Sequence, residues 1–181
     1  MILTRDELLE HRFLVINSSI QADMASELMC DLLLLDDDCH KDITLYINSP
    51  GGEVVAGNQI IDTMNAIQSH VITVNVGMCA SMGALILSSG AKRLSYPHAR
   101  VMIHEVSAGT EGKIRDMEAA LKNTSEINRT AMTMLANNCG KTYEQIMKDV
   151  RQDLWMNAEE AIKYGLIDEI VGREERIAKE G

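Results

Sequence analysis

Short apolar stretches alternate with amphipathic helical patterns along most of this chain, and this alternation restricts the folds that it can adopt. Mainly apolar runs of strand length occur at 13–16, 43–47, 71–76 and 101–103, and a further short strand is expected at 93–96. Between them, apolar side chains recur every three or four residues, as at 21–35, or fill a small-residue helical stretch at 78–87. Strands that alternate with helices in this way predict an α/β protein with a largely parallel sheet.

One longer helical pattern, at about 114–138, stands outside this alternation. Gly140 follows it and is a typical helix-ending residue. A helix of about 25 residues is about 37 Å long, which is more than a core built from 181 residues can cover. We therefore expect this helix to project and to bury its apolar side chains against another subunit. The segment before it, 106–112, is rich in Gly, Ser and Thr and is expected to be a flexible loop.

The charge of the chain excludes several kinds of partner. It has 17 basic and 27 acidic side chains, a formal net charge of −10. Acidic proteins bind polyanions poorly, so we expect neither nucleic acid nor an anionic membrane as a partner. No apolar run approaches the roughly 18–20 residues of a membrane helix, and the first residues do not resemble a secretory signal. These features predict a cytoplasmic protein.

The cysteines indicate neither a disulfide framework nor a metal site. The four are Cys30, Cys39, Cys79 and Cys139, and no two of them form a C-x-x-C pair. Cys39 and His40 are adjacent, but no second group of metal ligands lies nearby in the sequence. We expect free thiols in a reducing compartment, no metal and no cofactor.

Two sequence features resemble parts of an acyl-transfer site. Ser81 follows an apolar strand and precedes small residues typical of a helix, where free N–H groups and the helix dipole favour an oxyanion. The turn at 48–52 contains Gly51 and Gly52, whose backbone can approach a ligand closely. Each feature also has a simpler explanation, since Ser81 can be a helix cap and 48–52 a plain strand-to-helix turn.

Two further residues could complete such a site. His104 comes directly after the apolar strand at 101–103 and is well placed to act as a general base. Asp153 lies between a helix end and an apolar stretch, where it could orient an imidazole. Taken alone, His104 is better explained as a core histidine and Asp153 as a solvated charge at a helix end.

Together, these features resemble the proteolytic subunits of the Clp protease, which are serine peptidases of the crotonase-like fold. The resemblance covers about residues 8–172 and is carried by YINSPGG at 46–52, GMCASMGALILSSGAK at 77–92, PHARVMIHE at 97–105 and DVRQDLWMNAEEAIKYGLID at 149–168. It implies Ser81 as the nucleophile, His104 as the base and then the acid, and Asp153 as the residue that orients His104.

The resemblance also implies the surroundings of this triad. The backbone N–H groups of Gly52 and Met82 would form the oxyanion hole. Gly51, Gly52, Val106 and Ser107 would bind the substrate, with 106–112 as a strand beside the active site. Tyr46 would belong to a surface pocket that docks an AAA+ ATPase of the Clp type.

The implied fold is a single domain in which a spiral of β-β-α units forms a head, at 1–105 and 140–172. A handle helix, at about 106–139, projects from the head, and 173–181 is a polar tail. Handles would interdigitate between two stacked heptameric rings, a tetradecamer whose chamber holds the active sites. The implied function is hydrolysis of peptide bonds in unfolded polypeptides.

The sequence departs from the family pattern in three places. Family members usually carry a further N-terminal hairpin that lines the axial pore and contacts the ATPase, whereas this chain begins almost at the head. Glu105 and Val106 stand where Gln and Pro are usual, and the acid either perturbs His104 or points away from it. Arg151 and Gln152 stand where an acid and Arg are usual, which predicts a different pairing between rings.

Three alternative functions stay open on the sequence. A phage-type head-maturation protease shares the fold and would suit the short N-terminus. A regulatory paralogue would need an active partner subunit, and the Arg151–Gln152 change allows this. An acyl-CoA hydratase or isomerase shares the fold and the oxyanion hole, but it would bind CoA and would not need Ser81, His104 and Asp153 together.

Overall fold

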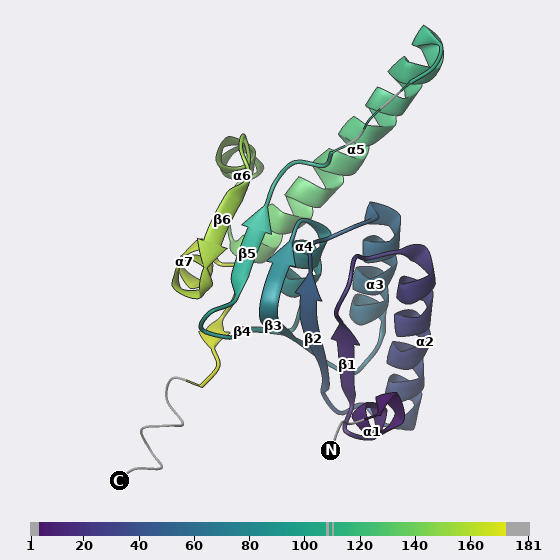
Figure 1. Ribbon diagram of the computed structural model, residues 1–181, viewed down its shortest axis with the longest axis vertical. Coiled ribbons are helices and arrows are strands. Elements are labelled where there is room, and N and C mark those ends of the chain that lie inside the picture. Colours follow the sequence, from purple (N-terminus) through teal and green to yellow (C-terminus); the bar gives the residue numbers. More distant parts are fainter. Residues whose placement is uncertain (1–3, 108, 110, 173–181) are drawn as a thin grey trace.

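The computed structural model describes residues 4–107, 109 and 111–172, and within them a seven-stranded sheet is covered by helices (Figure 1). The strands are β1 (Phe13–Ile16), β2 (Ile43–Ser49), β3 (Val71–Ala80), β4 (Lys92–Ser95), β5 (Arg100–Ile103), β6 (Leu154–Asn157) and β7 (Glu169–Ile170). The helices are α1 (Arg5–Glu10), α2 (Ala22–Asp38), α3 (Val54–Ala66), α4 (Met82–Ser88), α5 (Ile114–Cys139), α6 (Tyr143–Asp149) and α7 (Ala158–Tyr164). The predicted α/β class is confirmed. The predicted tail at 173–181 lies outside the described residues.

The long central strand β3 has different neighbours at its two ends. Along one edge it pairs with β2, and along the other its residues 72–75 pair with β4 and its residues 78–80 pair with β5, all in parallel. Asn75 lies where the two neighbours separate, and its side chain donates to the carbonyl oxygen of Arg100 (3.0 Å) and accepts from the N–H of Gly77 (3.2 Å). The end of β3 is therefore held beside β5 rather than β4.

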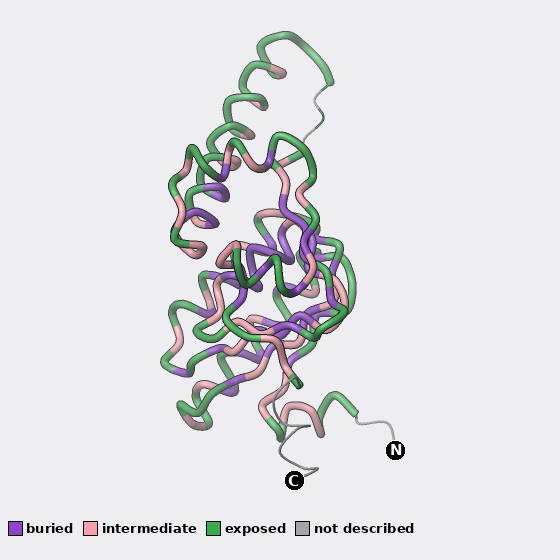
Figure 2. Tube along the Cα trace, turned by 90° about the vertical axis from the view of Figure 1, so that its left-hand side faces the viewer, coloured by how far each residue is buried: buried purple, intermediate pink, exposed green. Residues whose placement is uncertain are grey.

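The core lies between the sheet and its helices. α2 and α3 pack against each other on one face of the sheet, with Leu28 and Leu32 of α2 and Ile60 and Ile61 of α3 buried (Figure 1). Every residue of α4 is buried, which fits its small and apolar composition. Figure 2 shows this buried core in the head, below the exposed far part of α5.

The helix predicted at 78–87 begins later than expected, at Met82. Residues 78–80 continue strand β3 because they pair with β5 on one side, and Cys79 pairs with Ser49 of β2 on the other. Small apolar residues suit a helix and a buried strand almost equally, so their pattern alone does not decide between the two. The strands β6 and β7, two to four residues long, were not predicted as strands.

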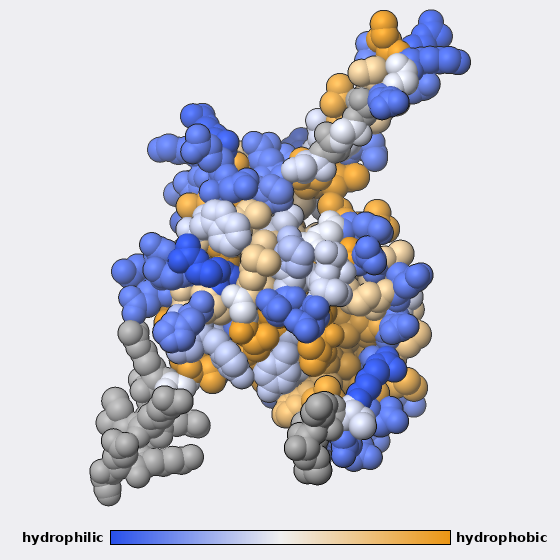
Figure 3. Space-filling model, viewed as in Figure 1, coloured by the Kyte–Doolittle hydropathy of each residue, from blue (hydrophilic) through white to orange (hydrophobic). Residues whose placement is uncertain are grey.

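The predicted long helix is confirmed as α5, which has 26 residues and stands clear of the rest of the chain along much of its length (Figure 1). Its buried residues are Ala131, Met132, Leu135 and Ala136, all near its C-terminal end. Nearer its beginning, Ile114 is 76% exposed and Leu121 is 56% exposed. Apolar surface is visible along the projecting part in Figure 3.

The C-terminal end of α2 is tied to the segment before β3 through Asp36. Its carboxylate accepts hydrogen bonds from the N–H and the hydroxyl of Ser69, both 2.8 Å, and from the N–H of Gln68 (3.2 Å). Burial raises the pKa of this carboxyl, but the hydrogen bonds outweigh that effect and lower it to about 2. The ionised carboxylate is thus the form that the fold stabilises.

Asp36 should therefore make the stability of the fold depend on pH in the acid range. Its ordinary pKa is 3.8 and its pKa in the fold is about 2, so its contribution is present above pH 3.8 and is lost as the pH falls toward about 2. In urea unfolding at pH 6 and pH 2.5, Asp36→Asn should cost free energy of unfolding at pH 6 and much less at pH 2.5. Asp37→Asn, at the exposed neighbouring position, is the control, and a cost of Asp36→Asn that does not change with pH would contradict the assignment.

Candidate active site

Ser81 lies between β3 and α4 in a backbone conformation that is rare for a residue with a side chain. Its φ is 55° and its ψ is −120°, and its N–H donates to the carbonyl oxygen of Met102 on β5 (2.8 Å). Ser81 occupies the N-cap position of α4, but its hydroxyl makes no capping hydrogen bond. Strained residues persist only where their surroundings hold them, and they cluster at functional sites.

The pairing of three strands brings His104 and Asp153 to Ser81. In the parallel ladder, Ala80 of β3 pairs with Met102 of β5, so Ser81 and the end of β5 lie at the same edge of the sheet. In the antiparallel ladder, Ile103 of β5 pairs with Leu154 of β6. One step beyond that pair, His104 and Asp153 come opposite each other.

The side-chain distances differ between the two contacts of the imidazole. His104 Nε2 lies 2.8 Å from Ser81 Oγ, within hydrogen-bonding distance. His104 Nδ1 lies 3.7 Å from Asp153 Oδ1, which is longer than a hydrogen bond. The side chain of His104 is 23% exposed and that of Asp153 is 61% exposed. The Ser81 hydroxyl and the imidazole are thus in hydrogen-bonding contact, while the Asp153 carboxylate is at the distance of a weaker electrostatic contact.

Two glycines bring the turn after β2 into contact with Ser81. Gly51 has a φ of 100°, and a Cβ atom there would lie 2.7 Å from the Cβ of Ser81 and 2.8 Å from the carbonyl oxygen of Ala80. Gly52 pairs with Ile20 in a short parallel bridge, where a Cβ would lie 2.1 Å from the Ile20 carbonyl oxygen. Both positions therefore require glycine.

The two N–H groups expected to form an oxyanion hole have no acceptor within the part of the chain that the structure describes. The hydrogen bonds around Gly52 run from the Ile20 N–H to the Gly51 oxygen and from the Glu53 N–H to the Ile20 oxygen, which leaves the N–H of Gly52 unused. The N–H of Met82 is likewise unused, at the start of α4. Such groups can stabilise a negative oxygen.

A pocket of about 140 Å³ opens beside Ser81 and His104, and most of its walls are apolar. Val54, Leu85 and Ile103 come from the head, while Met132 and Leu135 come from the long helix α5. No sequence pattern indicated that α5 contributes to this pocket, since Met132 and Leu135 have the spacing of any amphipathic helix.

Val106 and Ser107 also line this pocket, as expected of substrate-binding residues. The expected strand at 106–112 is not formed by those of its residues that the structure describes. A strand needs partners for its backbone groups, and the N–H of Val106 instead donates to the side chain of Asn128 on α5 (2.9 Å). Ala108 and Thr110, in the same stretch, lie outside the described residues.

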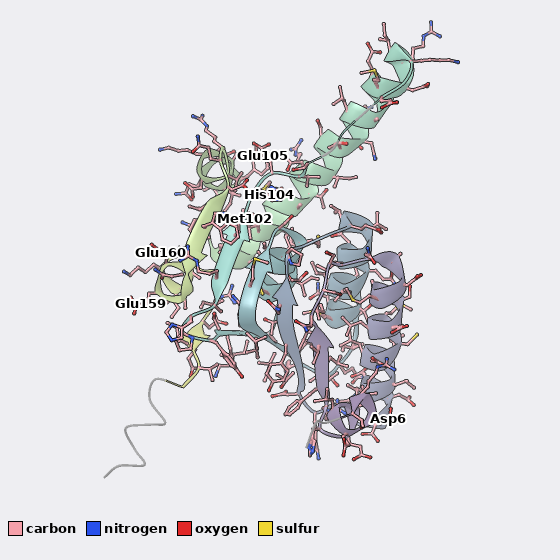
Figure 4. All side chains as sticks on the ribbon, in the orientation of Figure 1. Asp6, Met102, His104, Glu105, Glu159 and Glu160 are labelled. Atoms are coloured by element: carbon pink, nitrogen blue, oxygen red, sulfur yellow. The ribbon has the colours of Figure 1, made fainter. Side chains whose placement is uncertain are left out.

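Glu105 points away from the imidazole that precedes it. Its carboxylate accepts a hydrogen bond from the side-chain amide of Asn128 (3.2 Å). Figure 4 labels Met102, His104 and Glu105 along and just beyond the end of β5, beside α5. Of the two outcomes left open for Glu105, the structure has the one in which the acid is directed elsewhere.

Tyr46 lies on β2 and takes no part in the pocket beside Ser81. Its ring packs edge-on against Phe13 of β1, with 5.5 Å between centroids. Burial, with a smaller effect from Tyr96, raises the pKa of its phenol. Tyr46 and Phe13 thus form a partly buried aromatic pair on adjacent strands.

Cysteine or metal chemistry finds no support near this site. Cys79 is buried two residues before Ser81, and burial raises the pKa of its thiol well above the ordinary value, which disfavours a reactive thiolate. All four cysteines are free thiols.

Among the residues that the structure describes, no three potential ligands gather into a metal site. No helix in that part of the chain is long and apolar enough to cross a membrane.

Comparisons with known proteins identify the family of this chain. A relative from Streptococcus gordonii, an ATP-dependent Clp protease proteolytic subunit, is 46% identical over 169 residues, which cover 91% of this chain and 86% of the relative. Relatives of the same description from Streptococcus mutans and Streptococcus equi are each 44% identical over 173 residues, which cover 93% of this chain and 88% of each relative. The family model for Clp protease matches residues 2–174, and the chain therefore belongs to the Clp protease family.

Proposed function

We propose that this chain hydrolyses peptide bonds of unfolded polypeptides with Ser81 as nucleophile, His104 as base and acid, and Asp153 as the residue that orients His104. Membership of the Clp protease family makes the chain a serine endopeptidase. The observation that carries the residue assignment is the 2.8 Å contact between His104 Nε2 and Ser81 Oγ, at a strained turn beside two unused N–H groups.

The proposed reaction has two stages. His104 Nε2 takes the proton of Ser81 Oγ as that oxygen attacks the peptide carbonyl carbon, and the negative oxygen that forms is held by the N–H groups of Gly52 and Met82. His104 then gives its proton to the leaving amine, which leaves an acyl group on Ser81. A water molecule, activated by His104 in turn, releases the acyl group as a carboxylate.

Asp153 would act through His104. When the imidazole becomes protonated, the carboxylate 3.7 Å from Nδ1 stabilises the positive charge and favours the orientation in which Nε2 faces Ser81. Because Asp153 is 61% exposed, solvent weakens this effect until substrate or a neighbouring subunit covers it. This supports Asp153 in the third position of the triad.

The pocket favours substrates with an apolar side chain next to the bond that is cut. Val54, Leu85, Met132 and Leu135 offer apolar contacts and no buried charge to pair with a charged substrate residue. Gly51, Gly52, Val106 and Ser107 surround this pocket or adjoin it, and they would hold the extended backbone of the substrate.

We further propose that the chain works in an oligomer of stacked heptameric rings. The head at 1–105 and 140–172 would form each ring, and the handle at about 106–139 would contact the opposite ring. The exposed apolar residues Ile114 and Leu121 on α5 support this, because a projecting helix needs apolar cover. Tyr46 would dock an AAA+ ATPase of the Clp type in a cytoplasmic setting, and the description of the relatives as subunits of an ATP-dependent protease supports such a partner.

The serine–histidine contact favours this function over the acyl-CoA hydratase or isomerase alternative. Enzymes of that kind share an oxyanion hole, but they have no use for a serine hydroxyl in contact with an imidazole at a strained turn. A phage-type protease would retain the peptidase chemistry, and a regulatory paralogue would retain its residues. No specific contact in the structure favours either alternative.

A fluorophosphonate, which reacts with activated serines, tests the proposal directly. We expect the native protein to gain the mass of one adduct per chain, located at Ser81 by tandem mass spectrometry of its peptides. Among the residues that the structure describes, Ser81 is the one whose hydroxyl contacts an imidazole beside two unused N–H groups. Protein unfolded in urea is the control and should gain no adduct. An adduct on any other serine, or none on the native protein, would contradict the assignment.

A further inference from the structure

Asn128, in the middle of the long helix α5, is bonded to the segment that follows His104. Its side-chain oxygen accepts from the N–H of Val106 (2.9 Å), and its side-chain nitrogen donates to the carboxylate of Glu105 (3.2 Å). Among the hydrogen bonds of the described residues, these are the two that link residues 105–107 to α5. One amide group therefore fixes two consecutive residues directly after the proposed base.

The chemistry of the three groups suits asparagine and few other side chains. A backbone N–H can only donate, and an ionised carboxylate can only accept. A side chain that bridges these two groups must therefore accept a hydrogen bond from the Val106 N–H and donate one to the Glu105 carboxylate, as a side-chain amide does. Aspartate can accept but not donate, and an apolar residue can do neither.

The segment that Asn128 holds forms one wall of the pocket. Val106 and Ser107 line the pocket together with Val54, Leu85 and Ser81. Asn128 itself does not line the pocket. Any effect it has on substrate binding must act through the position of this wall.

We propose that Asn128 is a positioning residue that holds Val106 and Ser107 in place for substrate binding while leaving the reactivity of Ser81 unchanged. This rests on the proposed peptidase function. The hydrogen bond between His104 and Ser81 depends on strands β3 and β5, and within the described part of the chain Asn128 makes no hydrogen bond to either strand. Loss of Asn128 should therefore raise KM for peptides more than it lowers the rate at which Ser81 reacts with a small reagent.

Asn128→Asp tests this with the smallest change in shape. The new carboxylate can still accept from Val106, but it faces the carboxylate of Glu105 and repels it. We expect KM for a short fluorogenic peptide to rise about fivefold, the effect of losing about 1 kcal/mol of interaction, with the rate of fluorophosphonate reaction within about twofold of the original protein. Adding Glu105→Gln should restore KM, because the glutamine amide can donate to the new carboxylate.

The matched control is Asn123→Asp, which makes the same change of charge on an exposed part of the same helix. It should leave KM unchanged, and sedimentation should give the same particle for both variants. The proposal is overturned if KM of Asn128→Asp is unchanged, if peptide hydrolysis and fluorophosphonate reaction fall together, or if Glu105→Gln does not restore KM. A starting protein that reacts with neither reagent would overturn the proposed function itself, and this inference with it.

Discussion

Replacing His104 by alanine is expected to lower kcat for peptide hydrolysis as much as replacing Ser81 does, by about 10⁶-fold, the loss seen when either member of a serine–histidine pair is removed. The reason is the 2.8 Å contact between His104 Nε2 and Ser81 Oγ. Without the imidazole the hydroxyl keeps its proton, and without the hydroxyl the imidazole has no proton to take. The double variant should lose no more than either single variant, because the two residues act as one unit.

Hydrolysis of a fluorogenic peptide by equal amounts of assembled protein measures this effect, with mass spectrometry to exclude contamination by the original enzyme. His98→Ala is the control, because His98 is exposed in the turn after Pro97, and it should keep full activity. Residual activity of His104→Ala near one tenth of the original would show that another base serves Ser81. Additive losses in the double variant would show that the two residues act separately.

Much of the fold could be predicted because local sequence patterns indicate its strands and helices. The strands β1, β2, β4 and β5 and the helices α2 and α5 coincide closely with the strands and helices expected from local patterns. The start of α4 was predicted four residues too early. That error arose because the strand character of residues 78–80 depends on pairing with β5, which no local pattern reveals.

The candidate site divides in the same way. Ser81 and His104 stand at the ends of recognisable elements, which made them candidates, and the resemblance to Clp protease subunits implied the roles of Ser81, His104 and Asp153. The register of β3 with β5 and of β5 with β6 brings these three residues together, and no local pattern in the sequence indicates that register. The order of pairing had to come from the structure.

Residues contributed by the long helix were missed altogether. Met132 and Leu135 line the pocket, and Asn128 bonds to Val106 in the segment after His104. These roles depend on where α5 meets the head, because the three residues lie 24, 28 and 31 positions after His104 in the sequence. The same helix thus carries a wall of the pocket near its end and exposed apolar residues, Ile114 and Leu121, at its beginning. A subunit that contacted the beginning of α5 would therefore contact the same helix that lines the pocket near its other end.

Gly51→Ala should reduce kcat/KM by about 10²-fold, the loss that follows when reacting groups are displaced by about 1 Å. The added Cβ would lie 2.7 Å from the Cβ of Ser81 and 2.8 Å from the Ala80 oxygen, so either the turn or the serine has to move. The nearest atoms are the Cβ of Ser81 and backbone atoms of Ala80 and Met82, so no flexible end of a side chain can yield instead. The rate of the fluorophosphonate reaction should fall with peptide hydrolysis, in contrast to the effect expected for Asn128→Asp.

The control for this change is Gly172→Ala, which separates backbone strain from close contact. Gly172 has a φ of 90°, close to the 100° of Gly51, but nothing lies within 4 Å of the position where its Cβ would be. Both variants carry the strain of a left-handed backbone, roughly 1–2 kcal/mol for a residue with a side chain, and only Gly51→Ala meets Ser81. Thermal unfolding should show a loss of stability in both, and activity a loss in Gly51→Ala alone. Equal activity in the two variants would mean that catalysis does not need the close contact between Gly51 and Ser81. In that case Ile20 alone would hold Gly52 at the proposed oxyanion hole.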